Sequence, residues 1–305
     1  MSNNFSRRDF FSQASAAVGA VALAPTLRRV ASAGQVAASS AADTVTLGRT
    51  GIETSLLGIG TGFNGGNHSS AHVRMGQATF TKLLRHAIER GIRYIDTADM
   101  YGSHIFIREA LKGVDRSKLF IQTKTLATHP AVAKADIDRF REELGMDRLD
   151  SLLLHCMQKG TWRIDMRPVM DVLSEAKAKG TVRAVGISCH GLDPLLAAAE
   201  ADWPDVQLAR INPFGAAMDA PPGKPVSVDQ VVFLLRKIRG RGRGMIGMKI
   251  CGGGGNTGEA DRAKSLRFVL ASGCVDCFTV GFEKPEQIDQ AFDQIDAALK
   301  SIAAG

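Results

Sequence analysis

The chain has 305 residues, of which 45% are hydrophobic and 23% are charged. These proportions are close to globular averages and exclude wholesale disorder, and the lack of any apolar run of about 18 residues excludes a polytopic membrane protein. The formal net charge is +7; four arginines against one aspartate in residues 1–33 give 4 − 1 = +3, which leaves +4. A basic excess this small does not argue for a nucleic-acid partner. The five cysteines are scattered and odd in number, so no disulfide framework is visible.

The first residues have the pattern of an export signal. Arg7 and Arg8 precede a weakly apolar, alanine-rich stretch, Ala14–Leu27, and Ala31-Ser32-Ala33 offers a cleavage site. Paired arginines before such a segment are typical of twin-arginine signals, whose export machinery carries folded proteins. We therefore predict a signal peptide over residues 1–33, a flexible linker over 34–43, a periplasmic or otherwise exported mature protein, and no stable membrane span after cleavage. An amphipathic N-terminal helix is the alternative.

After the linker, short strand-like runs alternate with helical segments. Thr44–Leu47 and Ile52–Ser55 flank a glycine-bounded turn and predict a small hairpin. Eight further strands follow at a spacing of about 30 residues, each succeeded by a segment with apolar residues three and four apart. They are Leu57–Gly60, Arg93–Thr97, Leu119–Lys124, Asp150–His155, Ala184–Ser188, Gln207–Ile211, Met245–Ile250 and Asp276–Gly281. The alternation predicts an α/β fold, a (β/α)8 TIM barrel over residues 44–305. A doubly wound open sheet is the alternative, although no Gly-x-Gly-x-x-Gly follows the first strand.

Four polar side chains follow three consecutive barrel strands. Asp96 and Tyr101 come after the second strand, Lys124 closes the third and His155 closes the fourth. Because chemistry in such barrels lies at the carboxyl ends of the strands, we expect these groups at one rim. A lysine cation lowers the pKa of a nearby phenol, an aspartate holds that lysine, and a neutral imidazole hydrogen-bonds a carbonyl oxygen. The set predicts protonation of a carbonyl oxygen as hydride reaches its carbon, whereas each residue alone is more typical of a structural group.

The same residues resemble a known family. Ile95-Asp96-Thr97-Ala98 with Tyr101-Gly102 is similar to the signature of the aldo-keto reductases, and Lys124 and His155 match that family's lysine and histidine. The resemblance runs from about residue 44 to 301. It implies a barrel, a nicotinamide cofactor extended across the rim, and reduction of an aldehyde or ketone, or the reverse reaction. It also implies that Tyr101 is the general acid, that Lys124 and Asp96 tune it, and that His155 orients the substrate.

The resemblance places the nicotinamide end of the cofactor along the fifth to seventh barrel strands. Ser188 matches a serine that contacts the carboxamide, and Cys189 stands in place of the asparagine beside it. Leu208 falls where the family has a carboxamide-binding glutamine, with Gln207 one residue away. Met248-Lys249 occupies the place of an aromatic that commonly stacks on the ring, so Met248 would offer a softer face.

The resemblance also marks the other end of the cofactor. The run Gly252-Gly253-Gly254-Gly255 resembles the segment that folds over the pyrophosphate, where glycine permits close backbone approach. A plain flexible loop is the alternative. Gly281 and Gln287 stand where NADPH-selective members carry lysine and arginine, Gln290 stands at an adenine contact, and Lys284 is the only cation nearby. Because phosphate recognition normally needs arginine or lysine, the choice between NADP and NAD stays open.

Two further patterns suggest other chemistry. Thiols and imidazoles occur together at strand exits, in Cys156, Cys189, Cys251, His155 and His190. Such groups can bind zinc or copper, but they stand on separate strands without a short-range ligand pair, so we predict buried thiols and no metal. The basic run Arg236–Arg243 could bind RNA, but a cationic helix end leading into a loop is the favoured interpretation.

These features predict an NAD(P)H-dependent oxidoreductase acting on a small-molecule carbonyl or alcohol substrate. Free NAD(P)H is cytoplasmic, so an exported enzyme would fold around its nucleotide and keep it, oxidising one substrate and reducing another. A nucleotide-sensing or interaction protein on the same barrel, with vestigial catalysis, is the alternative. The two differ in whether Tyr101→Phe removes a turnover.

Overall fold

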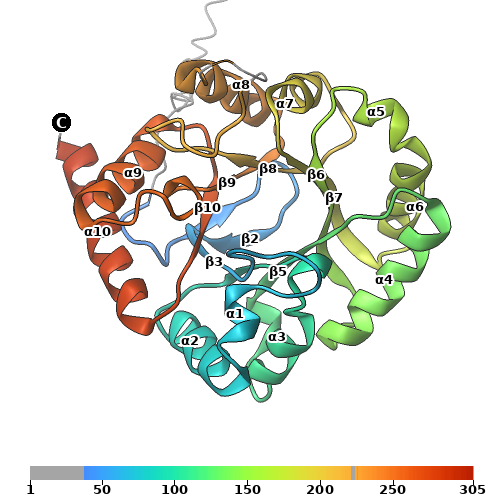
Figure 1. Ribbon diagram of the computed structural model, residues 1–305, viewed down its shortest axis with the longest axis horizontal. Coiled ribbons are helices and arrows are strands. Elements are labelled where there is room, and N and C mark those ends of the chain that lie inside the picture. The colour runs from blue at the N-terminus through green and yellow to red at the C-terminus, as the bar shows by residue number, and fades with distance from the viewer. Residues whose placement is uncertain (1–37, 221–223, 225, 305) are drawn as a thin grey trace, which may run out of the picture. The chain divides into compact units, whose positions relative to one another are not determined.

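The computed structural model describes residues 38–220, 224 and 226–304. Eight parallel strands close into a barrel, which Figure 1 shows end-on. In barrel order they are β10 (Cys277–Gly281), β3 (Leu57–Gly60), β4 (Tyr94–Asp96), β5 (Phe120–Thr125), β6 (Leu149–Met157), β7 (Val182–Cys189), β8 (Val206–Arg210) and β9 (Gly244–Met248). Because all pairs are parallel, every strand ends at the same rim. The predicted barrel is confirmed, and the open sheet is wrong.

A ring of helices surrounds the barrel (Figure 1). They are α2 (Gln77–Glu89), α3 (His104–Ala110), α4 (Pro130–Leu144), α6 (Arg167–Ala178), α7 (Leu192–Ala199), α8 (Val228–Gly240), α9 (Glu259–Ser272) and α10 (Pro285–Ala304). Shorter pieces lie in the loops: α1 (Ala71–Arg74), α5 (Trp162–Asp165), η1 (Asp99–Tyr101), η2 (Arg116–Lys118) and η3 (Gly252–Gly254). Within the described ranges, no helix is both long and apolar enough to cross a bilayer.

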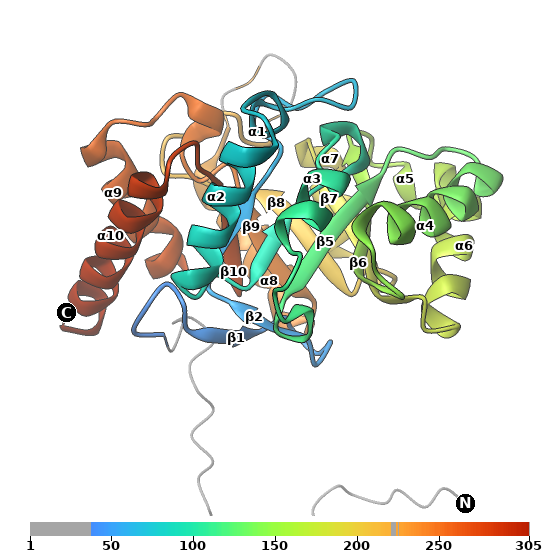
Figure 2. The ribbon, with the colours of Figure 1, turned by 90° about the horizontal axis from the view of Figure 1, so that it is seen from below.

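The predicted hairpin is confirmed as β1 (Thr44–Thr46) paired with β2 (Glu53–Ser55). Figure 2 shows it beneath the barrel, at the end where the strands begin. Its turn buries Leu47 and Ile52 in one apolar cluster with Tyr94 and Phe120 of the barrel interior. The Leu47 amide also donates to the Ile52 carbonyl at 2.9 Å. The hairpin therefore packs against the amino end of the barrel, and the carboxyl rim is left to the loops.

Side chains alternate between the barrel interior and the layer beneath the helices, as the pleat of a strand requires. Leu208 and Met248 belong to the interior cluster, whereas Ile187 and Ala209 belong to the outer core. A residue two positions after an interior one faces inward as well. Because of this alternation, the last inward-facing side chain of each strand lies at the mouth of the barrel.

Two strand ends differ from the sequence-based expectation. β9 ends at Met248 rather than at Ile250, because Lys249 adopts a left-handed backbone with φ of 58°. β6 continues past His155 to Met157 through a shift in register, and Cys156 within it has φ of 58°. Non-glycine residues rarely adopt this conformation, and such strain gathers at functional sites. Both irregularities lie at the carboxyl rim.

The predicted terminal segments divide at the boundary of the described residues. The predicted signal peptide lies outside them, as does the linker as far as residue 37. Residues 38–43 of that linker pack on the barrel rather than hanging free: Ala41 is buried, and its carbonyl accepts from the Leu57 amide at 3.0 Å. The basic run ends α8 and enters a loop as predicted, and Arg239 pairs with Asp276 at 2.7 Å.

Candidate active site

The four predicted catalytic residues come together at the carboxyl rim. Asp96 ends β4, Lys124 is the last but one residue of β5, and His155 lies near the end of β6. Tyr101 closes η1, the single helical turn that follows β4. The sequence predicted this grouping from strand order alone, and the barrel supplies it.

Lys124 and Asp96 form a buried ion pair at the base of this group. The ammonium lies 2.8 Å from Oδ1 of Asp96 and donates to the Thr97 carbonyl at 2.7 Å. Gln122, which the sequence analysis did not single out, donates to the same Oδ1 at 2.9 Å. Gln122 stands two residues before Lys124 and so faces the same side of the strand, which could have identified it from the sequence. These contacts fix the orientation of the Lys124 side chain, which is 1% exposed.

Tyr101 stands between this pair and His155. Its hydroxyl lies 3.4 Å from Nε2 of His155, and the Lys124 ammonium lies 5.0 Å from the centre of its ring. Gly62 and Gly65 face the ring: a Cβ on Gly62 would lie 2.3 Å from it, and one on Gly65 would lie 2.6 Å away. The ring therefore occupies space that only glycine leaves open, which limits where the hydroxyl can point.

The acidity of Tyr101 differs from the expectation. Tyr101 keeps some exposed surface, but the burial of its phenol, together with the Asp96 carboxylate, raises the pKa of Tyr101 well above its ordinary value. The net lowering predicted from Lys124 is wrong for this state. The physical reason is that burial disfavours the phenolate and that Asp96, 2.8 Å from the ammonium, offsets much of the stabilisation that the Lys124 charge gives. Tyr101 is consequently a neutral phenol at pH 7.

His155 is neutral as well. Burial, with Lys124 and His190 nearby, holds the pKa of His155 well below its ordinary value. Nε2 faces the Tyr101 hydroxyl, and Nδ1, which is buried, has no hydrogen-bond partner among the residues that the structure describes. The neutral imidazole can therefore form a hydrogen bond with a group placed beside Tyr101.

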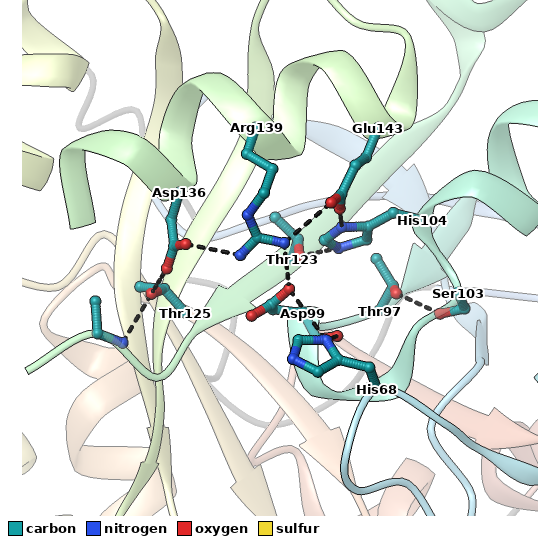
Figure 3. A network of polar contacts seen from close by, with 11 residues as sticks. His68, Thr97, Asp99, Ser103, His104, Thr123, Thr125, Asp136, Arg139 and Glu143 are labelled. Atoms are coloured by element: carbon teal, nitrogen blue, oxygen red, sulfur yellow. Dashed lines mark hydrogen bonds and ion pairs between the residues drawn. The ribbon is translucent and has the colours of Figure 1, made fainter. Parts of the chain in front are cut away.

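A polar network holds the turn that carries Tyr101 (Figure 3). Arg139 of α4 contacts Asp99 at 2.7 Å and Glu143 at 3.0 Å, and Asp99 lies in the same turn as Tyr101. His104 joins Glu143 to Thr123 of β5, each at 2.7 Å. The turn is thus tied to α4 and to the strand that carries Lys124.

The nicotinamide end of the predicted cofactor site is partly assembled. Ser188 is fully buried and pairs in register with Leu208, so both face the interior. The Ser188 hydroxyl has no hydrogen-bond partner within the described part of the chain. Gln207 faces the outer layer, where it donates to the Cys189 thiol at 2.9 Å. Neither Gln207 nor Cys189 can therefore replace the amide side chains that the family resemblance implies. Met248 lies at the mouth.

The glycine run forms a constrained turn. Gly252, Gly253 and Gly254 have φ of 61°, 69° and 101°, which side chains rarely adopt. A Cβ on Gly254 would lie 2.8 Å from the Phe63 ring. Glycine is therefore required by the backbone at these positions, which is consistent with the predicted close approach to a pyrophosphate.

Three further predicted cofactor residues lie near the start of α10. Gln287 accepts from the Glu283 amide at 2.7 Å, so its side chain serves the helix start. Gly281 is exposed at the end of β10. Gln290 accepts from Arg262 of α9 at 3.0 Å. The expectation that Lys284 is the only cation there is wrong, because Arg262 is remote in sequence and only the packing of α9 on α10 brings it near.

Thiols and imidazoles from separate strands come together at the rim, and the prediction of buried thiols is confirmed for Cys189 but wrong for Cys156 and Cys251, which are only partly buried. His155, Cys156 and His190 place their ligand atoms within 4.8 Å of one another. The register shift in β6 turns Cys156 toward the end of β7, so that its Sγ lies 3.5 Å from Nδ1 of His190. Residue spacing along separate strands could not reveal this contact.

The comparisons with known proteins agree with the geometry. Residues 56–264 match the family model described as the aldo/keto reductase family. An uncharacterized oxidoreductase of Bacillus subtilis is 30% identical over 128 residues, which are 38% of this chain and 44% of that protein. The methylglyoxal reductase of Salmonella typhi is 28% identical over 43% of this chain and 51% of its own length. The glycerol 2-dehydrogenase (NADP(+)) of Saccharomyces cerevisiae is 31% identical over 35% of this chain and 34% of its own length.

Solved structures share the fold over a larger part of the chain. An aldo-keto reductase from Pseudomonas aeruginosa superposes with a TM-score of 0.68 and 21% identity, covering 85% of this chain and 97% of that one. The holo form of an aldo-keto reductase from Bacillus halodurans superposes with a TM-score of 0.65 and 16% identity, covering 85% of this chain and 96% of that one. The curated relatives are matched over about half of their length or less, whereas the family model spans most of the barrel. The chain belongs to the aldo/keto reductase family.

Proposed function

We propose that the protein is an NAD(P)H-dependent oxidoreductase that reduces a small aldehyde or ketone, or runs the reverse reaction. The observation that carries the proposal is the neutral Tyr101 phenol, 3.4 Å from a neutral His155 and above the buried Lys124–Asp96 pair. The names of two relatives, a methylglyoxal reductase and a glycerol 2-dehydrogenase, support a small substrate that carries an oxo or hydroxyl group.

The residues at the rim fit a nicotinamide nucleotide. The buried Ser188 hydroxyl has no hydrogen-bond partner in the described part of the chain and is available to a carboxamide. Met248 would face the ring, and the turn that begins at Gly252 would lie over the pyrophosphate. Gly281, Gln287 and Gln290 would lie near the adenosine. Arg262, which contacts Gln290, supplies a guanidinium at that end and favours NADP over NAD. The bound nucleotide supplies the hydride.

The side chains of this chain handle the proton. His155 and Tyr101 hold the carbonyl oxygen between them, and Tyr101 donates its proton to that oxygen as the alkoxide forms. A neutral phenol is the form that can donate, so the raised pKa of Tyr101 favours this direction before the substrate binds. The phenolate that remains faces the Lys124 ammonium across the ring, and that charge stabilises it.

Replacing Tyr101 by phenylalanine tests the proposal. The variant keeps the ring between Gly62 and Gly65 but loses the donor, so kcat should fall by about 10²–10⁴-fold. Nucleotide affinity, measured by fluorescence titration, should stay within about threefold of wild type, because the phenol is not needed to hold the nucleotide. A wild-type protein that binds nucleotide but turns over no aldehyde, ketone or alcohol would instead favour the nucleotide-sensing alternative.

We also propose that residues 1–33 direct export by the twin-arginine route, on the strength of Arg7 and Arg8 and the weakly apolar segment after them. A reporter fused behind residues 1–43 should reach the periplasm, and replacing both arginines by lysine should retain it in the cytoplasm. Native purification of the exported form, followed by denaturation and mass measurement, should release about one NADP(H) or NAD(H) per chain. Release of none would contradict retention of the nucleotide.

A further inference from the structure

A second polar group lies at the rim, beside the catalytic one and not used by it. His190 follows β7, Arg210 ends β8 and Lys249 follows β9. Arg210 pairs in register with Met248, which belongs to the interior cluster, so its side chain also faces the mouth. It donates to Nδ1 of His190. Three neighbouring strands thus send basic or imidazole groups into one part of the opening.

The charge of this group is balanced only in part by carboxylates. Asp219 forms a long ion pair with Arg210, at 3.7 Å, and neither of its oxygens accepts a hydrogen bond from the residues described. Lys249 has no carboxylate within 4.0 Å in the described ranges. Outside those ranges the sequence has one acidic side chain, that of Asp9. By contrast, Lys124 is paired with its own aspartate.

Lys249 is held in this position at a cost. Its backbone is left-handed, and its carbonyl accepts from the Asn212 amide group at 3.1 Å and from the Gly252 amide at 2.9 Å. Burial, with Arg210 nearby, lowers the pKa of Lys249. A strained backbone that places one cation near another is what a protein tolerates where an anion is to be bound.

The group is continuous with the reaction centre. The ring centres of His190 and His155 are 6.2 Å apart, and His155 contacts the Tyr101 hydroxyl. Because arginine only donates, Nδ1 of His190 accepts and its proton lies on Nε2. An anion beside Arg210 would therefore also lie near the Nε2 proton of His190. It would be adjacent to the carbonyl group that Tyr101 and His155 would hold.

The same cluster is a poor metal site. His155, Cys156 and His190 lie within 4.8 Å, but the Nδ1 lone pair of His190 is already used by Arg210. Lys124, Arg210 and Lys249 surround the cluster with positive charge, which opposes a divalent cation and attracts an anion. Donors and positive charge dominate, which is the chemistry of carboxylate recognition.

We propose that Arg210 and Lys249, with His190, form a subsite for a carboxylate on the substrate, so that the preferred substrates are short oxo acids or the matching hydroxy acids. This inference rests on the proposed reduction, and the carboxylate itself undergoes no change of bonding. The other source of an anion is the pyrophosphate of the nucleotide, which the experiment separates.

The test compares 4-oxobutanoate with its methyl ester, which keeps the aldehyde and removes the charge. Wild type should show at least tenfold higher kcat/KM for the acid. Arg210→Met should reduce this ratio at least tenfold, mainly through KM, whereas the exposed control Arg167→Met should leave it unchanged. Nucleotide affinity is measured in parallel. If Arg210→Met weakens nucleotide binding tenfold and slows both substrates equally, the cations serve the cofactor and the proposal is overturned.

Direct binding separates this proposal from the proposed reduction. Calorimetric titration of 4-oxobutanoate into wild type should give a dissociation constant at least tenfold lower than for Arg210→Met. If wild type reduces neither aldehyde with either nucleotide but binds the acid through Arg210, the reduction fails and the anion site stands. If wild type reduces the ester as well as the acid and binds the acid no better than Arg210→Met does, the anion site fails and the reduction stands.

Discussion

The ammonium of Lys124 lies 2.8 Å from Oδ1 of Asp96, and both side chains are buried at the mouth of the barrel. Removing one partner of such a pair leaves the other charge without compensation, which typically costs about 3–5 kcal/mol. Lys124→Met should therefore lower the free energy of unfolding by that amount, because the Asp96 carboxylate stays buried with only neutral donors. Urea unfolding at pH 7 measures the loss.

The matched control is the double variant Asp96→Asn with Lys124→Met. It removes both charges, and asparagine can still accept from Gln122. We expect the double variant to recover at least half of the stability that Lys124→Met loses, while both variants lack turnover. Equal stability of the two variants would show that the carboxylate is not the source of the loss.

Gly62→Ala tests how closely the position of Tyr101 is defined. A Cβ at residue 62 would lie 2.3 Å from the Tyr101 ring, so the ring must move. A displacement of about 1 Å at a reacting group can lower the rate by about 10²-fold, and we expect kcat to fall by that order. Nucleotide affinity should be unchanged. Gly66→Ala is the control, because nothing lies within 4 Å of a Cβ there, and its kcat should stay within about twofold. Normal kcat for Gly62→Ala would mean that the ring position is not required.

The strands and the four catalytic positions could be predicted from the sequence because both depend on local pattern and chain order. Alternation locates each strand, although not its last residue, and parallel strands end at one rim, so Asp96, Lys124 and His155 had to meet. The cofactor-binding side chains depend on which residues of a strand face inward. A shift of one residue turns Gln207 to the outer layer and leaves Leu208 inside the barrel. The resemblance already places Gln207 one residue from the expected position, but which of the two side chains faces inward is decided by the fold.

The basic group at the rim was missed for a related reason. Arg210 reads as the end of an ordinary strand, and its role depends on His190 and Lys249, which reach it from other strands. The left-handed backbone at Cys156 and Lys249 turns these residues toward the mouth. Since neither is glycine or asparagine, local sequence preference argues against that conformation. Only the packing of the rim imposes it.

His190 should make the fold sensitive to acid. Burial, together with Arg210, lowers the pKa of His190 to about 3, whereas an unfolded histidine has a pKa of 6.5. Between these values the unfolded chain binds a proton that the native chain does not, so stability is complete above pH 6.5 and falls as the pH decreases toward 3. At pH 4.5, two units below 6.5, the loss due to this one residue should be roughly 3 kcal/mol.

His190→Gln removes the titrating group and keeps an acceptor for Arg210. Urea unfolding at pH 7.0 and at pH 4.5 should show that the variant loses roughly 2–3 kcal/mol less than wild type over this interval. Asp219, whose pKa burial raises to about 6, acts with the opposite sign, but it is present in both proteins and largely cancels in the difference. The exposed His129→Asn, which keeps an acceptor for the Ala131 amide, should lose as much as wild type. An equal loss for wild type and His190→Gln would show that His190 takes up its proton as readily in the folded chain as in the unfolded one.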